Sequence, residues 1–187
     1  MRDIVKSIEE EYVRYKALGE KALAQVADAD LSREPPGNGN SLAALVWHIA
    51  GNLESRFTDF RTADGEKPTR DRDSEFQPRD VTRAEVLDKW ERGWAPLLAE
   101  VTALTDADLS DTIVIRTQPL RIDQALERSL AHAAYHVGQV VYLAKLWAGD
   151  RWGSLSIPIG QSAAFNAKLA ASKEAYSATA YLEKKQA

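Results

Sequence analysis

Apolar residues recur every three or four positions along four long stretches of the chain, which is the spacing of an amphipathic α-helix. These stretches cover about residues 4–26, 41–61, 82–104 and 123–149. Segments rich in polar residues, proline and glycine separate them, such as "DADLSREPPGNGN" after the first stretch, and such segments do not continue a helix. The pattern therefore predicts an all-α fold built on four long helices.

Residues at the predicted helix ends support this interpretation. Ser41, or the asparagine before it, can cap the first amides of the second helix. Thr82 and Glu85 have the spacing of a capping box at the start of the third helix, and Pro96 inside that helix is a candidate for a kink. Asp123 is the predicted cap of the fourth helix.

The segments between and after these helices predict the remaining elements. "TIVIRTQPLRI", residues 112–122, alternates apolar and polar residues around a turn, which indicates two short strands. The connection over residues 62–81 is longer than those usual between neighbouring bundle helices, so it is either a crossover or a functional loop. Residues 162–183 form a weaker, alanine-rich helical pattern. We thus expect a four-helix bundle with a long connection between its second and third helices, a small hairpin and a C-terminal helix.

Composition narrows the class of protein. The 187 residues are 44% apolar, which is enough for a single domain, residues 1–187, with a continuous core. The chain has no cysteine, and this excludes disulfides, cysteine zinc ligands and a cysteine nucleophile. A net charge of −4 with scattered cations argues against a nucleic-acid partner. No segment approaches the ~20 apolar residues of a membrane span, so we expect a cytoplasmic protein without membrane or nucleic-acid partners.

Three histidines are candidate metal ligands. His132 and His136 lie four residues apart in the fourth predicted helix, so they differ by ~40° around its axis and can converge on one point. Two buried neutral imidazoles need partners for their ring nitrogens, and a metal ion supplies such a partner. His48, taken alone, fits a hydrogen-bonded core histidine better than a ligand. Its place on a second core-facing helix nevertheless favours a site of three histidines.

Such a site has chemical consequences. Three neutral imidazoles leave at least one coordination position of a divalent ion open, which is the pattern of a catalytic rather than a structural site. No acidic residue shares the helix faces of the histidines nearby, because Glu54 and Glu127 point away and Asp59 lies ~16 Å along the axis. The ion would therefore act chiefly as a Lewis acid, unless an acid of the 62–81 connection supplies a base.

Four further residues near the histidines have two interpretations each. Asn52 and Gln139, each one turn from a histidine, are candidates to bind a ligand or orient an imidazole, or are polar residues that close the core. Arg128 either meets an anionic substrate group or is a solvated helix arginine, of which the second is the simpler interpretation. Tyr135 fits packing better than proton transfer.

Three segments carry a resemblance to a known family. The segments "WHIAGN", "HAAYHVGQVVYLAK" and "LSIPIGQSAAFNAK" resemble the DinB-like (damage-inducible) superfamily, in particular its group called domain of unknown function 1572. The resemblance implies a four-helix bundle with a long crossover between its second and third helices. It also implies a metal-binding histidine triad, which falls on His48, His132 and His136.

The same resemblance implies an activity and an assembly. Characterised members of the superfamily include thiol-dependent S-transferases and isomerases. For this chain it implies one divalent metal ion, zinc or nickel, a small-molecule substrate, a low-molecular-weight thiol and a homodimer. A metal-dependent hydrolase and a non-catalytic module that binds a metal or ligand are the alternatives, and an open pocket beside the metal site would favour an enzyme.

Overall fold

The computed structural model describes residues 1–172 and residue 178. Its long helices occupy the four stretches that the apolar pattern predicts, namely α1 (Asp3–Leu23), α3 (Leu42–Phe57), α4 (Arg83–Ala103) and α5 (Ile122–Ala148). The shorter elements are α2 (Asp28–Leu31), η1 (Asp73–Phe76), η2 (Asp108–Ser110), β1 (Thr112–Ile115), β2 (Gln118–Arg121), η3 (Gly149–Arg151) and α6 (Ser162–Ser172). The expectation of a helical fold with one small antiparallel hairpin is confirmed.

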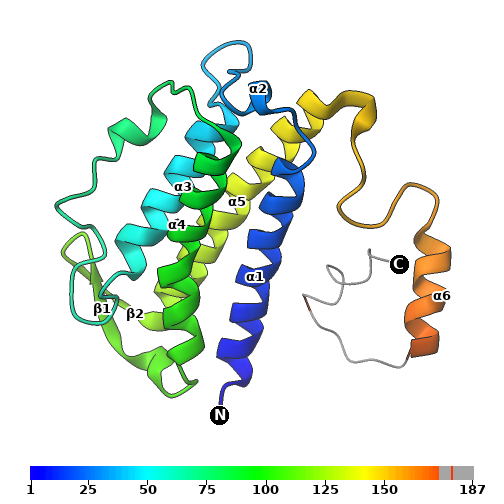
Figure 1. The fold of residues 1–187 in the computed structure, drawn as a ribbon. Coiled ribbons are helices and arrows are strands. Elements are labelled where there is room, and N and C mark those ends of the chain that lie inside the picture. The colour runs from blue at the N-terminus through cyan, green and yellow to red at the C-terminus, as the bar shows by residue number, and fades with distance from the viewer. Residues whose placement is uncertain (173–177, 179–187) are drawn as a thin grey trace.

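The four long helices lie side by side (Figure 1). α3 packs against α4 and α5, and α1 packs against the same two helices. Tyr12 of α1 and the two tryptophans Trp90 and Trp94 of α4 are fully buried in the shared core. At one helix crossing, a Cβ atom built on Gly93 of α4 would lie 2.4 Å from the Cβ atom of Ala50 in α3. This close approach fixes the position of α3, on which His48 lies.

Two predicted caps are present at the helix ends. The Ser41 hydroxyl accepts a hydrogen bond from the Ala44 amide at 3.1 Å, so it caps α3. Thr82 and Glu85 form the reciprocal hydrogen bonds of a capping box at the start of α4. α4 then continues as one helix through Pro96.

The predicted cap of α5 is wrong. The helix begins at Ile122, and its N-cap residue is Arg121. Asp123 lies in the first turn, where its carboxylate is 2.6 Å from the guanidinium of Arg121. Ile122 is fully buried and its amide donates to the carbonyl of Asp111, so the helix begins directly after β2.

The connection between α3 and α4 is fastened to the hairpin. The Gly65 amide donates to the Val114 carbonyl of β1 at 2.8 Å, and the Asp64 carboxylate accepts from the amides of Arg116 and Thr117 at 2.7 Å each. These last two residues form the hairpin turn with φ of 53° and 63°, a left-handed conformation that the hydrogen bonds to Asp64 offset. Farther along, η1 of the same connection packs on α3.

α6 covers the first part of the predicted C-terminal helix. It contains no buried residue, and Figure 1 shows it apart from the four long helices. Apart from residue 178, the rest of that predicted helix, residues 173–183, lies outside the described residues. Within the described part of the chain, no helix combines the length and the apolar character needed to cross a membrane.

Candidate metal centre

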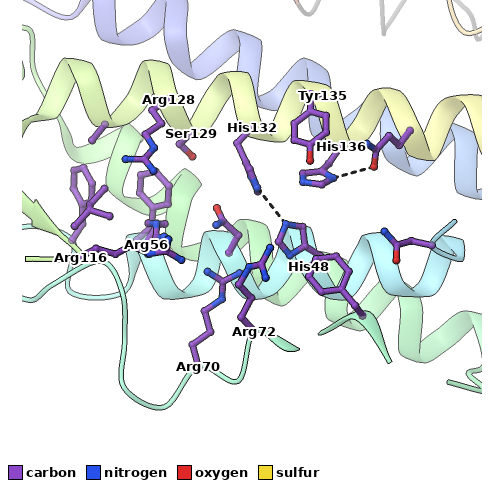
Figure 2. A pocket seen from close by; sticks show the side chains of 18 residues that line it. His48, Arg56, Arg70, Arg72, Arg116, Arg128, Ser129, His132, Tyr135 and His136 are labelled. Atoms are coloured by element: carbon purple, nitrogen blue, oxygen red, sulfur yellow. Dashed lines mark hydrogen bonds between the residues drawn. The ribbon is translucent and has the colours of Figure 1, made fainter. Parts of the chain in front are cut away.

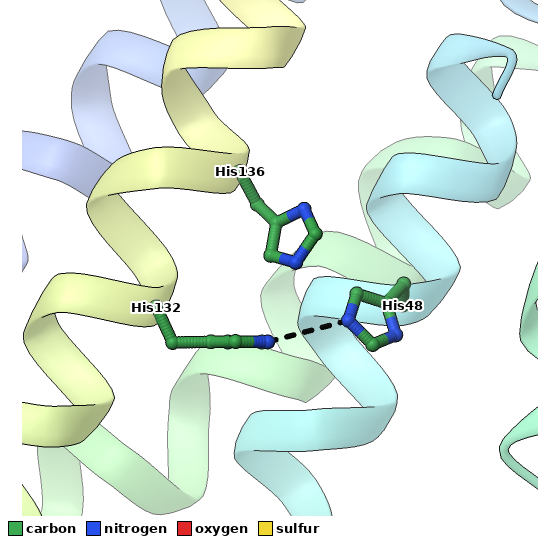
Figure 3. A group of neighbouring side chains, drawn as sticks. All are labelled: His48, His132 and His136. Atoms are coloured by element: carbon green, nitrogen blue, oxygen red, sulfur yellow. Dashed lines mark hydrogen bonds between the residues drawn. The ribbon is translucent and has the colours of Figure 1, made fainter. Parts of the chain in front are cut away.

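The structure brings the three predicted histidines together between α3 and α5 (Figure 3). His48 extends from α3, and His132 and His136 extend from successive turns of α5. One ligand nitrogen from each ring can be chosen so that all three lie within 4.8 Å of one another. The Nε2 atoms of His48 and His132 are 3.3 Å apart. The i, i+4 spacing and the packing of α3 on α5 together produce this convergence.

The environment of the triad favours neutral imidazoles. Burial and the neighbouring His136 and His48 lower the pKa of His132 to about 3. Burial and His48 likewise lower the pKa of His136 to about 4, although a hydrogen bond to Gln139 opposes this shift. Both rings are therefore neutral at neutral pH, and neutral imidazole is the form that binds a metal ion.

Glu75 orients the first histidine. Its carboxylate Oε2 lies 2.8 Å from Nδ1 of His48, and its side chain is only 7% exposed. Arg70 donates to both oxygens of the same carboxylate, from Nε at 2.7 Å and Nη2 at 2.9 Å. Burial opposes ionisation of Glu75, but the hydrogen bonds from His48 and Arg70 bring its pKa below the ordinary value. The ionised carboxylate accepts a hydrogen bond from Nδ1–H of His48, which leaves the Nε2 lone pair directed toward the other two rings.

Gln139 orients His136 in the same way. Its side-chain Oε1 lies 3.1 Å from Nδ1 of His136, so it accepts a hydrogen bond from Nδ1–H and leaves Nε2 as the ligand atom. Of the two interpretations of Gln139, the structure therefore supports an orienting contact. The ring of Tyr135 packs 3.9 Å from the ring of His136, measured between centroids, and its side chain is exposed.

A pocket of about 380 Å³ opens beside the triad (Figure 2). All seven residues that the sequence singled out line it, namely His48, Asn52, Arg128, His132, Tyr135, His136 and Gln139. Its walls come from α3, α5, the hairpin and the connection that precedes α4. A metal ion held by the three histidines would thus face a cavity large enough for a small molecule.

Sequence reasoning missed the contribution of the connection to this pocket. Glu75 contacts His48 from behind, and the ring of Phe76 lies 4.5 Å from the His48 ring. Arg70 and Arg72 of the same connection also line the pocket. The unusual length of the connection and its acids were the only signals, because a segment without a long helix or strand has no apolar period that shows which way its residues point.

The predicted lack of a nearby acid on the helices agrees with the structure. Glu54 of α3 points to Lys89 of α4, with Oε2 and Nζ 2.8 Å apart. Among the described residues, no aspartate or glutamate lines the pocket. The donor set therefore consists of three imidazole nitrogens without a carboxylate, and such a set could hold a metal ion.

Comparison with known proteins identifies one family. The model of the family described as "Protein of unknown function (DUF1572)" matches residues 1–161, the part of the chain that contains all three histidines. No curated protein matches the chain.

Proposed function

The chain belongs to the DUF1572 family, whose function is unknown, and we propose that it is a metal-dependent enzyme of the DinB-like superfamily. In this proposal, its four long helices form the bundle typical of that superfamily. The enzyme transfers the sulfur of a low-molecular-weight thiol to a small electrophile. The observation that carries the proposal is the convergence of three histidines on the wall of a pocket of about 380 Å³.

His48, His132 and His136 would hold one divalent cation, and zinc and nickel both suit this set of nitrogens. Such a cation is a Lewis acid, and it lowers the pKa of a thiol or water molecule that it coordinates. Glu75 and Gln139 would keep the Nε2 atoms of two histidines directed at the cation. A structural ion, by contrast, is usually enclosed by four protein ligands.

The lining of the pocket favours thiol transfer over hydrolysis. Attack by water would benefit from a carboxylate base, and no carboxylate of the described chain lines the pocket. The nearest candidate, Glu75, is already bonded to His48 and Arg70. A thiol is acidic enough to lose its proton to water when a cation lowers its pKa. Its sulfur then bonds to carbon, and the leaving group departs with the bonding electron pair. Since the chain has no cysteine, the thiol must be a separate molecule.

Assays of the metal-loaded protein test this proposal. A chlorinated aromatic compound and an epoxide are supplied with and without low-molecular-weight thiols, next to a panel of esters and amides. We expect turnover of an electrophile that requires thiol, and loss of both this turnover and the stoichiometric metal in His136→Ala, because two imidazoles bind a divalent ion far more weakly than three.

The other outcomes identify the alternatives. Hydrolysis of an ester without thiol, absent in His136→Ala, would replace the transferase with a metal-dependent hydrolase. Stoichiometric metal without turnover in either panel would leave a non-catalytic metal-binding module. Full metal content in His136→Ala would contradict the triad itself. The variant Arg92→Gln, at an exposed position on α4 away from the pocket, serves as the control.

A further inference from the structure

The pocket beside the triad is strongly cationic. Its lining contains the five arginines Arg56, Arg70, Arg72, Arg116 and Arg128, and no acidic residue of the described chain. Arg56 belongs to α3 and Arg128 to α5. Arg70 and Arg72 belong to the connection between α3 and α4, and Arg116 belongs to the turn of the hairpin. Figure 2 shows their side chains on both walls of the pocket.

Three of these arginines have structural partners. Arg70 holds the carboxylate of Glu75. Arg56 and Arg116 share Glu66, which they approach to 2.7 Å and 3.0 Å. Burial lowers the pKa of Arg56, and the nearby Arg70 and Arg116 add to this shift against the attraction of Glu66. The two carboxylates thus compensate only part of the positive charge around the pocket.

The other two arginines lack a strong partner. Arg128 makes no hydrogen bond or ion pair with any residue in the described part of the chain. The closest carboxylate to Arg72 belongs to Asp73, at 3.8 Å, and this side chain is 93% exposed, so water screens the interaction. The Arg72 guanidinium also lies 5.2 Å from the ring centroid of Phe76, which itself contacts His48. Arg128 extends from α5 and Arg72 from the opposite wall (Figure 2).

We propose that this pocket selects small molecules that carry an oxyanionic group, a carboxylate or a phosphate, and that Arg128 and Arg72 bind this group from opposite walls. A guanidinium offers a fork of N–H donors that matches the geometry of such oxyanions. An anion placed between the two arginines also neutralises charge that no side chain of the lining compensates. The selection of a substrate by this pocket rests on the proposed function, whereas the binding of an oxyanion does not.

The dimensions of the pocket restrict the ligand further. Arg128 lies one helical turn, ~6 Å, from His132 along α5. Arg128 and the triad line the same pocket, so a small molecule with its oxyanion at Arg128 can extend along the pocket toward the histidines. Phe57, Phe60 and Ile115 also line the pocket, so it offers apolar surface in addition to the guanidinium groups. The substrate class is a short organic acid or phosphate ester with an apolar, electrophilic body.

Binding measurements with matched charged and neutral probes test this inference. Isothermal titration calorimetry of the purified protein compares benzoate and phenyl phosphate with benzamide, which has the same apolar body without the charge. We expect at least one anion to bind roughly tenfold more tightly than benzamide, since hydrogen bonds to charged groups are the stronger ones. We expect Arg128→Gln and Arg72→Gln each to reduce this affinity by about the same factor and to leave benzamide unaffected.

Arg128→Gln is the decisive variant, because Arg128 supports no other described residue and its replacement leaves the fold and the triad intact. Arg92→Gln, which removes an exposed guanidinium from α4, is the matched control and leaves anion affinity unchanged. The preferred anion identifies carboxylate or phosphate as the group. Equal affinities for anion and amide, no detectable binding of any probe, or wild-type affinity in Arg128→Gln would each overturn the inference. Metal content and thiol transfer, measured on the same variants, report separately on the proposed function.

Discussion

At the scale of single residues, Glu75 links the candidate metal centre to the rest of the molecule. Its buried carboxylate receives hydrogen bonds from His48 and from Arg70, so it both orients a metal ligand and fixes an arginine of the pocket. A carboxylate behind a ligating histidine also raises the basicity of the imidazole. Glu75 is therefore a positioning residue, and the affinity for the metal ion is the property that should depend on it.

We predict that Glu75→Gln weakens metal binding by roughly 10- to 100-fold, the range typical for loss of such an orienting carboxylate. A titration with zinc against a competing chelator measures this change. Glu54→Gln is the control. It removes a carboxylate of α3 that contacts Lys89 and does not line the pocket, so it should keep wild-type affinity for zinc. Wild-type zinc affinity in Glu75→Gln would show that the contact with His48 has no influence on the metal centre.

The residue scale is also where prediction from sequence reached its limit. The three histidines were predictable because helical periodicity places His132 and His136 on one face and His48 on a core-facing helix. Glu75, Arg70 and Arg72 were not, because they belong to a connection that contains no long helix. Their direction depends on hydrogen bonds to the hairpin and on packing against α3, and neither leaves a periodic pattern in the sequence.

At the scale of elements, the position of α3 depends on its close packing against α4 at Gly93. A methyl group there would meet the backbone and side chain of Ala50, and helices adjust to such overlap only by moving apart. We predict that Gly93→Ala lowers the free energy of unfolding by about 1–3 kcal/mol, the usual cost of an overpacked core. Chemical denaturation measures this value.

Gly138 of α5 provides the matched control. It is exposed, and a Cβ atom added there meets nothing within 4 Å among the described atoms. Gly138→Ala should therefore raise the free energy of unfolding by about 0.5–1 kcal/mol, since alanine is the better helix former. A loss of stability in Gly138→Ala similar to that in Gly93→Ala would show that the loss in Gly93→Ala does not come from contact with Ala50.

The elements themselves were largely predictable. Four stretches with helical spacing became the four long helices, and the capping box of Thr82 and Glu85 marks the start of α4. Asp123 misled the prediction because its side chain resembles a cap, while burial of Ile122 and the hydrogen bond from its amide to Asp111 determine where α5 begins. Tertiary contacts of this kind outweigh the local capping preference.

At the scale of the whole molecule, burial of the triad makes stability depend on pH. The pKa values of His132 and His136 in the folded protein are about 3 and about 4, against an ordinary value of 6.5. Above 6.5 both residues are neutral in the folded and the unfolded chain. As the pH falls below 6.5, the unfolded chain takes up protons first, so the free energy of unfolding decreases until the folded pKa values are reached.

We predict that the metal-free protein loses stability between about pH 6.5 and about pH 4. Denaturant midpoints at several pH values in this range measure the loss. The double variant of His132→Ala and His136→Ala lacks the two groups and should show a smaller decrease over the same range. An equal decrease in the double variant would assign the effect to other titrating groups.

The connection between α3 and α4 has a consequence for how this molecule can diversify. The metal ligands belong to two packed helices, whereas one wall of the pocket belongs to a connection that is fastened to the hairpin through Asp64 and Gly65 and to α3 through Glu66 and Glu75. Loops accept substitutions and changes of length far more readily than a packed core. The sequence of this wall of the pocket, and with it the choice of ligand, can therefore change while the three histidines stay the same. The loop could therefore be replaced in an engineered variant, provided that the new sequence retains a carboxylate that bonds to Nδ1 of His48.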